Sequence, residues 1–117
     1  MRFFQVTLLH QKGRKKIMQE ANIENYLKRC VEDKGGLCLK FNSSSMRGLP
    51  DRIIVLPGGR IVFSEVKAPK QKPRPEQLRV HEQLKRLGAE VFVIDSKEKV
   101  KEVLYEICTA QVPENGN

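Results

Sequence analysis

The chain has 117 residues, of which 39% are hydrophobic, and its 22 Lys and Arg residues outnumber its 14 Asp and Glu residues. This length fits one domain with one core, and the hydrophobic fraction excludes an intrinsically disordered chain. The formal net charge of +8 favours nucleic acid or another acidic surface as the partner. No apolar run approaches the roughly 20 residues of a membrane-spanning helix, so we expect no membrane partner.

The first 17 residues differ in character from the rest of the chain. They contain five basic residues and no acidic one, and a short apolar stretch comes before the main basic run. A secretory signal has the opposite order, so we expect a cytoplasmic protein. Three widely spaced cysteines without a CxxC motif also fit a reducing compartment and disfavour a zinc site or a disulfide framework.

Two interpretations of residues 1–17 stay open. The segment is either a basic extension of the native protein or a translated stretch upstream of a native start at Met18. The second interpretation rests on residues 13–16, whose codons can form a purine-rich run that resembles a ribosome-binding site. We therefore expect a basic extension over residues 1–17, one domain over residues 18–108 and a disordered tail over residues 109–117.

Seven elements are predicted in chain order. Residues 20–34 form a helix, because Ile23, Leu27 and Val31 recur at helical spacing before two glycines. Residues 51–56 and 60–66 form a hairpin around a Pro-Gly-Gly turn. The other elements are strands over residues 37–41 and 90–94, a helix over residues 75–87 after a proline-broken basic loop, and a last helix capped by Ser96.

The order of these elements predicts an α/β fold. The strand over residues 90–94 follows a crossover helix, so it should lie parallel to the second hairpin strand. The result is a mixed four-stranded sheet flanked by helices in the order α-β-β-β-α-β-α. Continuous apolar runs in the hairpin strands predict that both faces of the sheet are covered. The crossover helix should bury Leu78, His81, Leu84 and either Leu87 or Lys85, with His81 as a helix-face residue rather than a catalyst.

The hairpin carries the residues with the most evident chemistry. A three-residue loop makes Leu56 and Arg60 partners, and it also places Asp51 opposite Glu65, because opposed residue numbers have a constant sum. Lys67 lies two residues beyond Glu65 and shares its face. A two-residue loop would turn Asp51 to the other face, so this interpretation depends on the type of turn.

Two opposed carboxylates repel each other, and a cation relieves the repulsion. Mg²⁺ prefers oxygen ligands and keeps several waters, so Asp51, Glu65 and the Val66 backbone carbonyl suffice to hold it. The ammonium group of Lys67 can orient a water molecule or stabilise charge near a phosphate. A solvated surface cluster is the alternative, but charge beside strongly apolar strands is costly unless it is paired.

Three segments together resemble the VRR-NUC branch of the PD-(D/E)xK nuclease superfamily. They are Arg47-Gly48-Leu49-Pro50-Asp51, then Phe63-Ser64-Glu65-Val66-Lys67, then Gln77 at the start of the next helix. The resemblance covers residues 20–107. It implies a restriction-endonuclease-like core and hydrolysis of DNA phosphodiesters with Mg²⁺ or Mn²⁺. It also implies that Asp51 and Glu65 hold the metal ion, that Lys67 positions or activates the attacking water, and that Gln77 lies beside the site.

The superfamily also places an acidic residue of the first helix near the metal ion. Glu20 and Glu24 compete for this role, because residues four apart share one helix face. We favour Glu24, since its separation from the helix-ending Gly36 resembles that in related archaeal junction resolvases. Glu20 is the alternative helix carboxylate.

Basic residues next to these motifs are candidate contacts for DNA phosphates. A solvated charged loop is the alternative for any one of them. The candidates are Arg47, Lys70, Lys72, Arg74 and Arg79.

Stand-alone members of this branch resemble phage or prophage proteins that cleave branched DNA. The resemblance therefore implies a phage-encoded endonuclease in a bacterial host cell that resolves four-way (Holliday) junctions without a small-molecule cofactor. Two coordinated cuts in a symmetric junction imply a C2 homodimer, with the apolar faces of the first and last helices as candidate interfaces. The alternatives are a less selective endonuclease for flapped or single-stranded DNA and a non-catalytic DNA-binding module.

Overall fold

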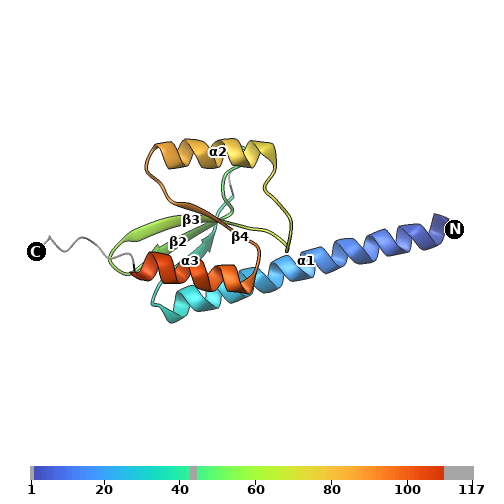
Figure 1. Ribbon diagram of the computed structural model, residues 1–117, viewed down its shortest axis with the longest axis horizontal. Coiled ribbons are helices and arrows are strands. Elements are labelled where there is room, and N and C mark those ends of the chain that lie inside the picture. The colour runs from blue at the N-terminus through green and yellow to red at the C-terminus, as the bar shows by residue number, and fades with distance from the viewer. Residues whose placement is uncertain (1, 43–44, 110–117) are drawn as a thin grey trace, which may run out of the picture.

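The computed structural model describes residues 2–42 and 45–109, with side chains from residue 12 onward, as a sheet between two layers of helices (Figure 1). The element order α-β-β-β-α-β-α confirms the predicted α/β fold. Helix α2 lies above the sheet in this view, and α1 and α3 lie below it. The elements are α1 (Arg2–Asp33), β1 (Leu37–Lys40), β2 (Arg52–Leu56), β3 (Arg60–Val66), α2 (Pro75–Arg86), β4 (Val91–Ile94) and α3 (Lys97–Thr109).

The sheet has the strand order β1-β2-β3-β4 and is mixed, as predicted. Strands β1, β2 and β3 are antiparallel neighbours, and β4 lies parallel to β3. In the hairpin Leu56 pairs with Arg60, which confirms the three-residue loop. Gly58 and Gly59 take φ angles of 91° and 85°, which residues with a Cβ rarely adopt. This turn fixes the register on which the position of Asp51 depends.

The hydrophobic core lies between the sheet and the pair α1 and α3. Ile23, Leu27 and Val31 of α1 are buried at the helical spacing that the sequence predicts. Full burial of a side chain of this size stabilises a fold by about 1.5–3 kcal/mol. The apolar face of α3 lies in the same core through Val103 and Ile107. Because each monomer buries both helix faces in its own core, the prediction that they form a dimer interface is wrong.

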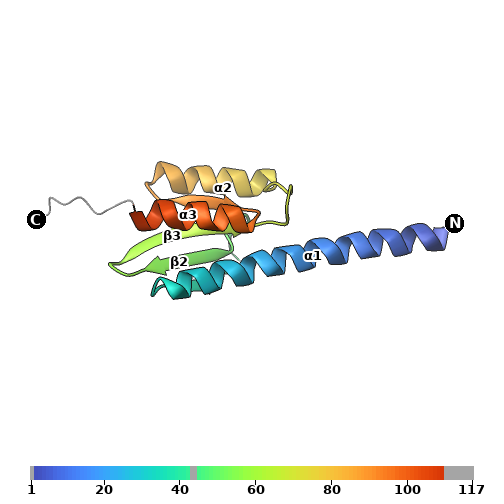
Figure 2. The same ribbon diagram turned by 60° about the horizontal axis from the view of Figure 1, so that its bottom comes forward.

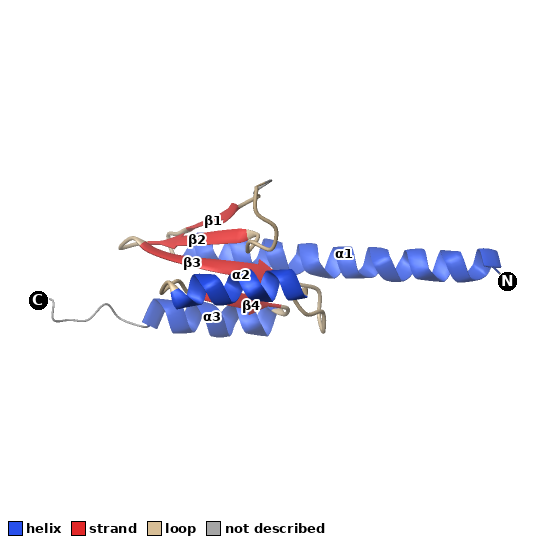
Figure 3. Ribbon diagram, turned by 90° about the horizontal axis from the view of Figure 1, so that it is seen from above, coloured by secondary structure: helices blue, strands red, loops and turns tan. Residues whose placement is uncertain are grey.

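The opposite face of the sheet is only half covered, which corrects the prediction that both faces are covered. Figure 3 shows α2 over β4 and the end of β3, so that β1, β2 and the start of β3 lie outside its reach. Leu37, Leu39 and Ile61 on this open half are 55%, 46% and 56% exposed. The reason is topological: one crossover helix lies along the strands on this face, and its width of about 10 Å covers about two strands spaced roughly 4.8 Å apart.

The buried face of α2 also differs from the predicted stripe. Gln77, Val80 and His81 are buried, whereas Leu78 and Leu87 are 50% and 85% exposed. Helix α2 is oriented with Gln77 and His81 toward the end of β3. Leu78 and Leu87 therefore point to solvent. A pattern search for apolar residues cannot find a buried face that is mainly polar.

Helix α1 continues without a break through the boundary expected after residue 17 (Figure 2). Its first half projects beyond the rest of the protein, and residues 12–18 are exposed. At the other end Thr109 still belongs to α3, and residues 110–117 of the expected disordered tail lie outside the described residues. None of the helices in the described part of the chain is long and apolar enough to cross a membrane.

Candidate active site

The two predicted carboxylates lie at the ends of neighbouring strands. The confirmed register pairs Arg52 with Ser64, so Asp51 and Glu65 are the next residues in line. Asp51 Oδ1 accepts a hydrogen bond from the Val66 backbone amide at 3.3 Å, which ties the start of β2 to the end of β3. Both carboxylates line a cavity of about 390 Å³ between the loop after β1 and the start of α2.

Glu65 is buried, and two donor groups contact one of its carboxylate oxygens. Its Oε2 accepts a hydrogen bond from Gln77 Nε2 at 3.1 Å and lies 3.6 Å from Lys67 Nζ. Burial, followed by the nearby Asp51 charge, raises the pKa of Glu65 to about 7, although Lys67 opposes the shift. Burial likewise raises the pKa of Asp51, which the hydrogen bond from Val66 partly offsets. The structure therefore brings together Asp51, Glu65, Lys67 and Gln77, the residues that the sequence analysis named.

The raised pKa of Glu65 predicts that the metal-free protein loses stability as pH rises. Its pKa is about 7 in the folded state and near 4.5 in the unfolded state, so the folded state binds the proton more tightly. The stabilising contribution is complete below pH 4.5 and is lost as pH rises through 7. Urea denaturation in EDTA should show the wild type losing about 2 kcal/mol more than Glu65→Gln between pH 5 and pH 8. Equal losses in the two proteins would contradict the assignment.

Gln77 is held in place by the first turn of its own helix. Pro75 occupies the first helical position, as predicted, and Gln77 stands two residues later. Gln77 Oε1 accepts a hydrogen bond from the Arg74 backbone amide at 2.8 Å, which orients Nε2 toward Glu65. The start of α2 therefore fixes one oxygen of the Glu65 carboxylate.

His81 contacts the other oxygen of Glu65, and this contact was missed by the sequence analysis. His81 Nε2 lies 3.7 Å from Glu65 Oε1, beyond hydrogen-bond distance, and both atoms are buried without a hydrogen-bond partner. Burial lowers the pKa of His81, with Lys85 and Lys67 as smaller causes in the same direction. The spacing in the sequence could have revealed this contact, because His81 follows Gln77 by one helical turn and the two residues share one face of α2.

Both candidate helix carboxylates approach the site from α1. Glu24 forms an ion pair with Arg52 at 3.2 Å, and the two side chains are 20% and 14% exposed. Burial raises the pKa of Glu20, and so do Glu24 and Asp51, whereas Lys67 lowers it. The structure thus brings Glu20 and Glu24 together beside Asp51 and pairs one of them with a cation.

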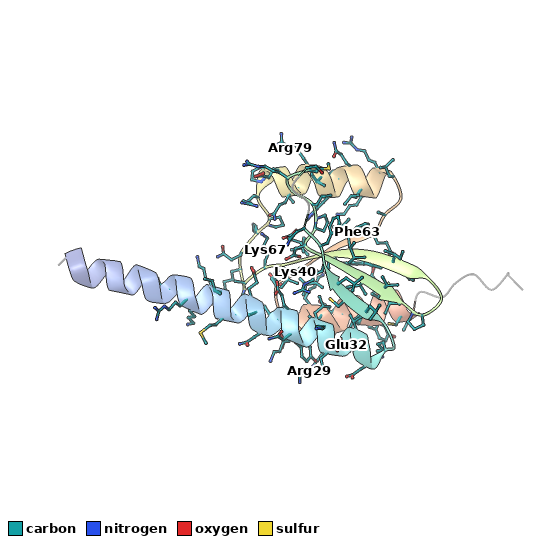
Figure 4. The ribbon with its side chains drawn as sticks, turned by 180° about the vertical axis from the view of Figure 1, so that it is seen from behind. Arg29, Glu32, Lys40, Phe63, Lys67 and Arg79 are labelled. Carbon is teal, nitrogen blue, oxygen red and sulfur yellow. The ribbon has the colours of Figure 1, made fainter. Side chains whose placement is uncertain are left out.

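The candidate DNA-binding residues divide between the site and the surface. Arg47 and Arg74 line the cavity that holds Asp51 and Glu65. Lys72 lines a groove next to Lys67, and Lys70 is exposed in the same loop. Arg79 lies on the far side of α2 and is well separated from Lys67 (Figure 4).

Gly48 lets the loop after β1 pack closely against the first turn of α2. Its φ is 88°, and a Cβ there would lie 2.6 Å from the Glu76 backbone oxygen. We expect Gly48→Ala to lower the free energy of unfolding by about 3 kcal/mol, from backbone strain and the clash together. Gly59→Ala is the matched control, because Gly59 has a similar φ of 85° but open space around it.

The Gly59→Ala control should lose only about 1 kcal/mol, which is the backbone term alone. Urea denaturation of the two variants measures the difference. Because Glu76 precedes Gln77, the clash in Gly48→Ala also shifts the residue that holds Glu65. Equal losses of stability in the two variants would contradict the close packing of this loop on α2.

The donor atoms at this site suit a divalent cation. Glu65 Oε1 is buried without a donor, and the neighbouring Asp51 charge disfavours ionisation of Glu65. No cluster of three or more His, Cys, Asp or Glu side chains placed to hold a metal ion occurs among the described residues. Mg²⁺ needs only one or two carboxylates, because it keeps several waters. Asp51, Glu65 and the Val66 carbonyl therefore fit Mg²⁺ or the similar Mn²⁺.

Comparison with known proteins identifies the family. No protein-family model matches the chain. "Putative nuclease p44" of Acyrthosiphon pisum secondary endosymbiont phage 1 is 46% identical over 83 residues, which cover 71% of this chain and 89% of that protein. A solved structure described as a VRR_NUC domain matches with a TM-score of 0.70 and 36% identity, over 80% of this chain and 98% of that one. The chain therefore belongs to the VRR-NUC family of nucleases.

Proposed function

We propose that this protein is a metal-dependent endodeoxyribonuclease that hydrolyses phosphodiester bonds in the cavity beside Asp51 and Glu65. One observation carries the proposal: the opposed carboxylates, with Lys67 Nζ 3.6 Å from Glu65 Oε2. A module that only binds DNA gains nothing from buried carboxylates, because they repel phosphates as well as each other. Membership of a nuclease family supports the same conclusion.

The residues have distinct roles in this proposal. A divalent cation would be held by Asp51, Glu65 and the Val66 carbonyl, and would supply positive charge next to the phosphate. Lys67 orients the attacking water and stabilises negative charge that develops on the phosphate oxygens. Gln77 is a positioning residue, since it touches Glu65 and is fixed by the Arg74 amide.

We infer that Glu20 is the helix carboxylate that faces the reacting groups, in place of the preferred Glu24. Both carboxylates interact electrostatically with Asp51, but Glu24 is engaged by Arg52, whereas Glu20 also interacts with Glu65 and Lys67. Glu20 also shares a groove with Lys67. In this arrangement Glu24 positions Arg52 at the start of β2, and Glu20 would add an acceptor for water beside the cation.

Two matched variants test this division of roles. We expect Glu20→Gln to lower the cleavage rate about tenfold or more without loss of stability, because it removes an acceptor at the site. Glu24→Gln should instead lower the free energy of unfolding by about 1 kcal/mol, because Arg52 loses its charged partner. Cleavage rates and urea denaturation measure both effects. A larger loss of cleavage in Glu24→Gln would return the role to Glu24.

Branched DNA, in particular the four-way junction, is the substrate that we propose, with two copies of the chain acting together. A symmetric junction needs two cuts, and the site at Asp51 and Glu65 in one chain supplies one of them. The open half of the sheet, with Leu37, Leu39 and Ile61 exposed, provides an apolar surface for a second copy. The less selective alternative, a flap or single-strand endonuclease, would need no such pairing.

The choice of substrate is tested with labelled four-way junction, 5′-flap and linear duplex in Mg²⁺ at equal concentrations. We expect paired symmetric cuts in the junction and little cutting of the duplex, from a protein that sediments as a dimer. Equal cutting of all three substrates would keep the nuclease and remove the junction specificity. Tight binding without a cut product would favour the non-catalytic module.

A further inference from the structure

A second hollow adjoins the proposed catalytic cavity, and half of its lining residues are cations. It is a groove of about 470 Å³ between α1 and the loop after β3. Arg74 lines both hollows, so the groove leads directly from the site. Its lining residues are Lys16, Ile17, Glu20, Lys67, Ala68, Gln71, Lys72 and Arg74.

The charge of this groove favours an anionic ligand. Four of its side chains are basic, and Glu20 is its one acidic side chain. Lys12 lies one turn before Lys16 and so extends the same row of α1 beyond the groove. Residues 12–19 contain no acidic residue, and Lys12 and Lys16 are exposed. A positive row therefore runs outward from the site along α1.

The projecting N-terminal half of α1 holds Lys12 and Lys16 in a regular helix. Residues 12–18 are helical and exposed, and this part of α1 projects past the rest of the fold (Figure 2). Over the four residues from Lys12 to Lys16 a helix rises about 6 Å. One DNA strand carries a phosphate every roughly 3.4 Å along the duplex axis, so the two lysines can face about two phosphates.

We propose that this groove, together with the row of Lys12 and Lys16, binds the phosphate backbone of the DNA on one side of the cleaved bond. The proposal rests on the proposed nuclease function, because that function places a scissile phosphate beside Lys67. Backbone that leaves the site past Lys67 and Arg74 enters the groove and meets Lys72 on one wall and Lys16 on the other. The contacts are to phosphate, so they add affinity without sequence preference.

The experiment compares two double variants of one helix. Lys12→Gln with Lys16→Gln removes two charges from the groove row, and Lys28→Gln with Arg29→Gln removes two charges from the exposed surface of the same helix outside the groove. Binding to a labelled linear duplex is measured in EDTA, so that cleavage does not interfere. The slope of log K against log salt concentration reports the number of phosphate contacts.

We expect the groove pair to reduce this slope by about 1.8, which corresponds to two phosphate contacts, and the control pair to reduce it by less than about 0.5. The single-turnover cleavage rate at saturating protein should stay within about threefold of the wild type in the control pair. Equal slope changes in the two pairs, or none in the groove pair, would overturn the proposal. Binding is measured without cleavage, so the two proposals can fail separately. A wild type that cleaves no DNA would refute the nuclease function, and the salt dependence of binding would still show whether the groove contacts phosphates.

Discussion

Lys67→Met is expected to lower the single-turnover cleavage rate by at least about a hundredfold while DNA affinity falls by less than tenfold. Lys67 Nζ lies 3.6 Å from Glu65 Oε2, and its side chain is 17% exposed, so it stands at the reacting groups with little competing water. Removal of a charged group that stabilises a transition state costs about 10²–10³ in rate. Methionine keeps the length of the side chain and removes the charge. Quenched-flow cleavage and fluorescence anisotropy measure the two quantities.

Lys101→Met is the matched control for this variant. Lys101 is exposed on α3, outside the cavity and the groove, and its substitution removes the same charge from the chain. The control should cleave at the rate of the wild type. Cleavage by Lys67→Met within threefold of the wild type would show that Lys67 is a structural cation and has no part in the reaction.

Asp51→Asn is expected to abolish cleavage, with a loss of about a thousandfold or more, through the loss of metal binding. Asparagine can keep the side-chain oxygen that accepts from the Val66 amide, so the strand ends stay joined. The variant removes one of two carboxylates that hold the cation, and the remaining Glu65 becomes easier to ionise because the Asp51 charge is gone. Binding of a ligand to the folded state raises the melting temperature.

The melting temperature with and without Mg²⁺ at pH 8 therefore measures this effect. The wild type should melt several degrees higher when Mg²⁺ is added, and Asp51→Asn should respond only weakly. The metal-free variant should be at least as stable as the metal-free wild type at this pH, because the repulsion between the carboxylates is removed. An unchanged response to Mg²⁺ in Asp51→Asn would place the cation elsewhere.

The part of the site that could be predicted from the sequence depends on local geometry. The turn at Gly58 and Gly59 sets the register of two adjacent strands, and register alone brings Asp51 to Glu65. Pro75 at the start of α2 similarly fixes where Gln77 stands on its helix. These relations span few residues, and each has a strong conformational cause.

The features that were missed depend on contacts between distant segments. The buried face of α2 includes Gln77 and His81, which both face Glu65 at the end of β3, and no periodicity of apolar residues reveals this. The ion pair of Glu24 with Arg52 joins residues 28 positions apart, so no local pattern predicts it. The open half of the sheet follows from the presence of a single crossover helix on a face of four strands.

The most direct test of the central claim is the cleavage of a labelled four-way junction by the wild type, first in EDTA and then after Mg²⁺ is restored. The site at Asp51, Glu65 and Lys67 predicts no product in EDTA and full recovery of cleavage on addition of Mg²⁺ in excess of the chelator. Lys67→Met run in parallel should stay inactive in both conditions, which excludes a contaminating nuclease. Cleavage that persists in EDTA, or that survives in Lys67→Met, would contradict the account.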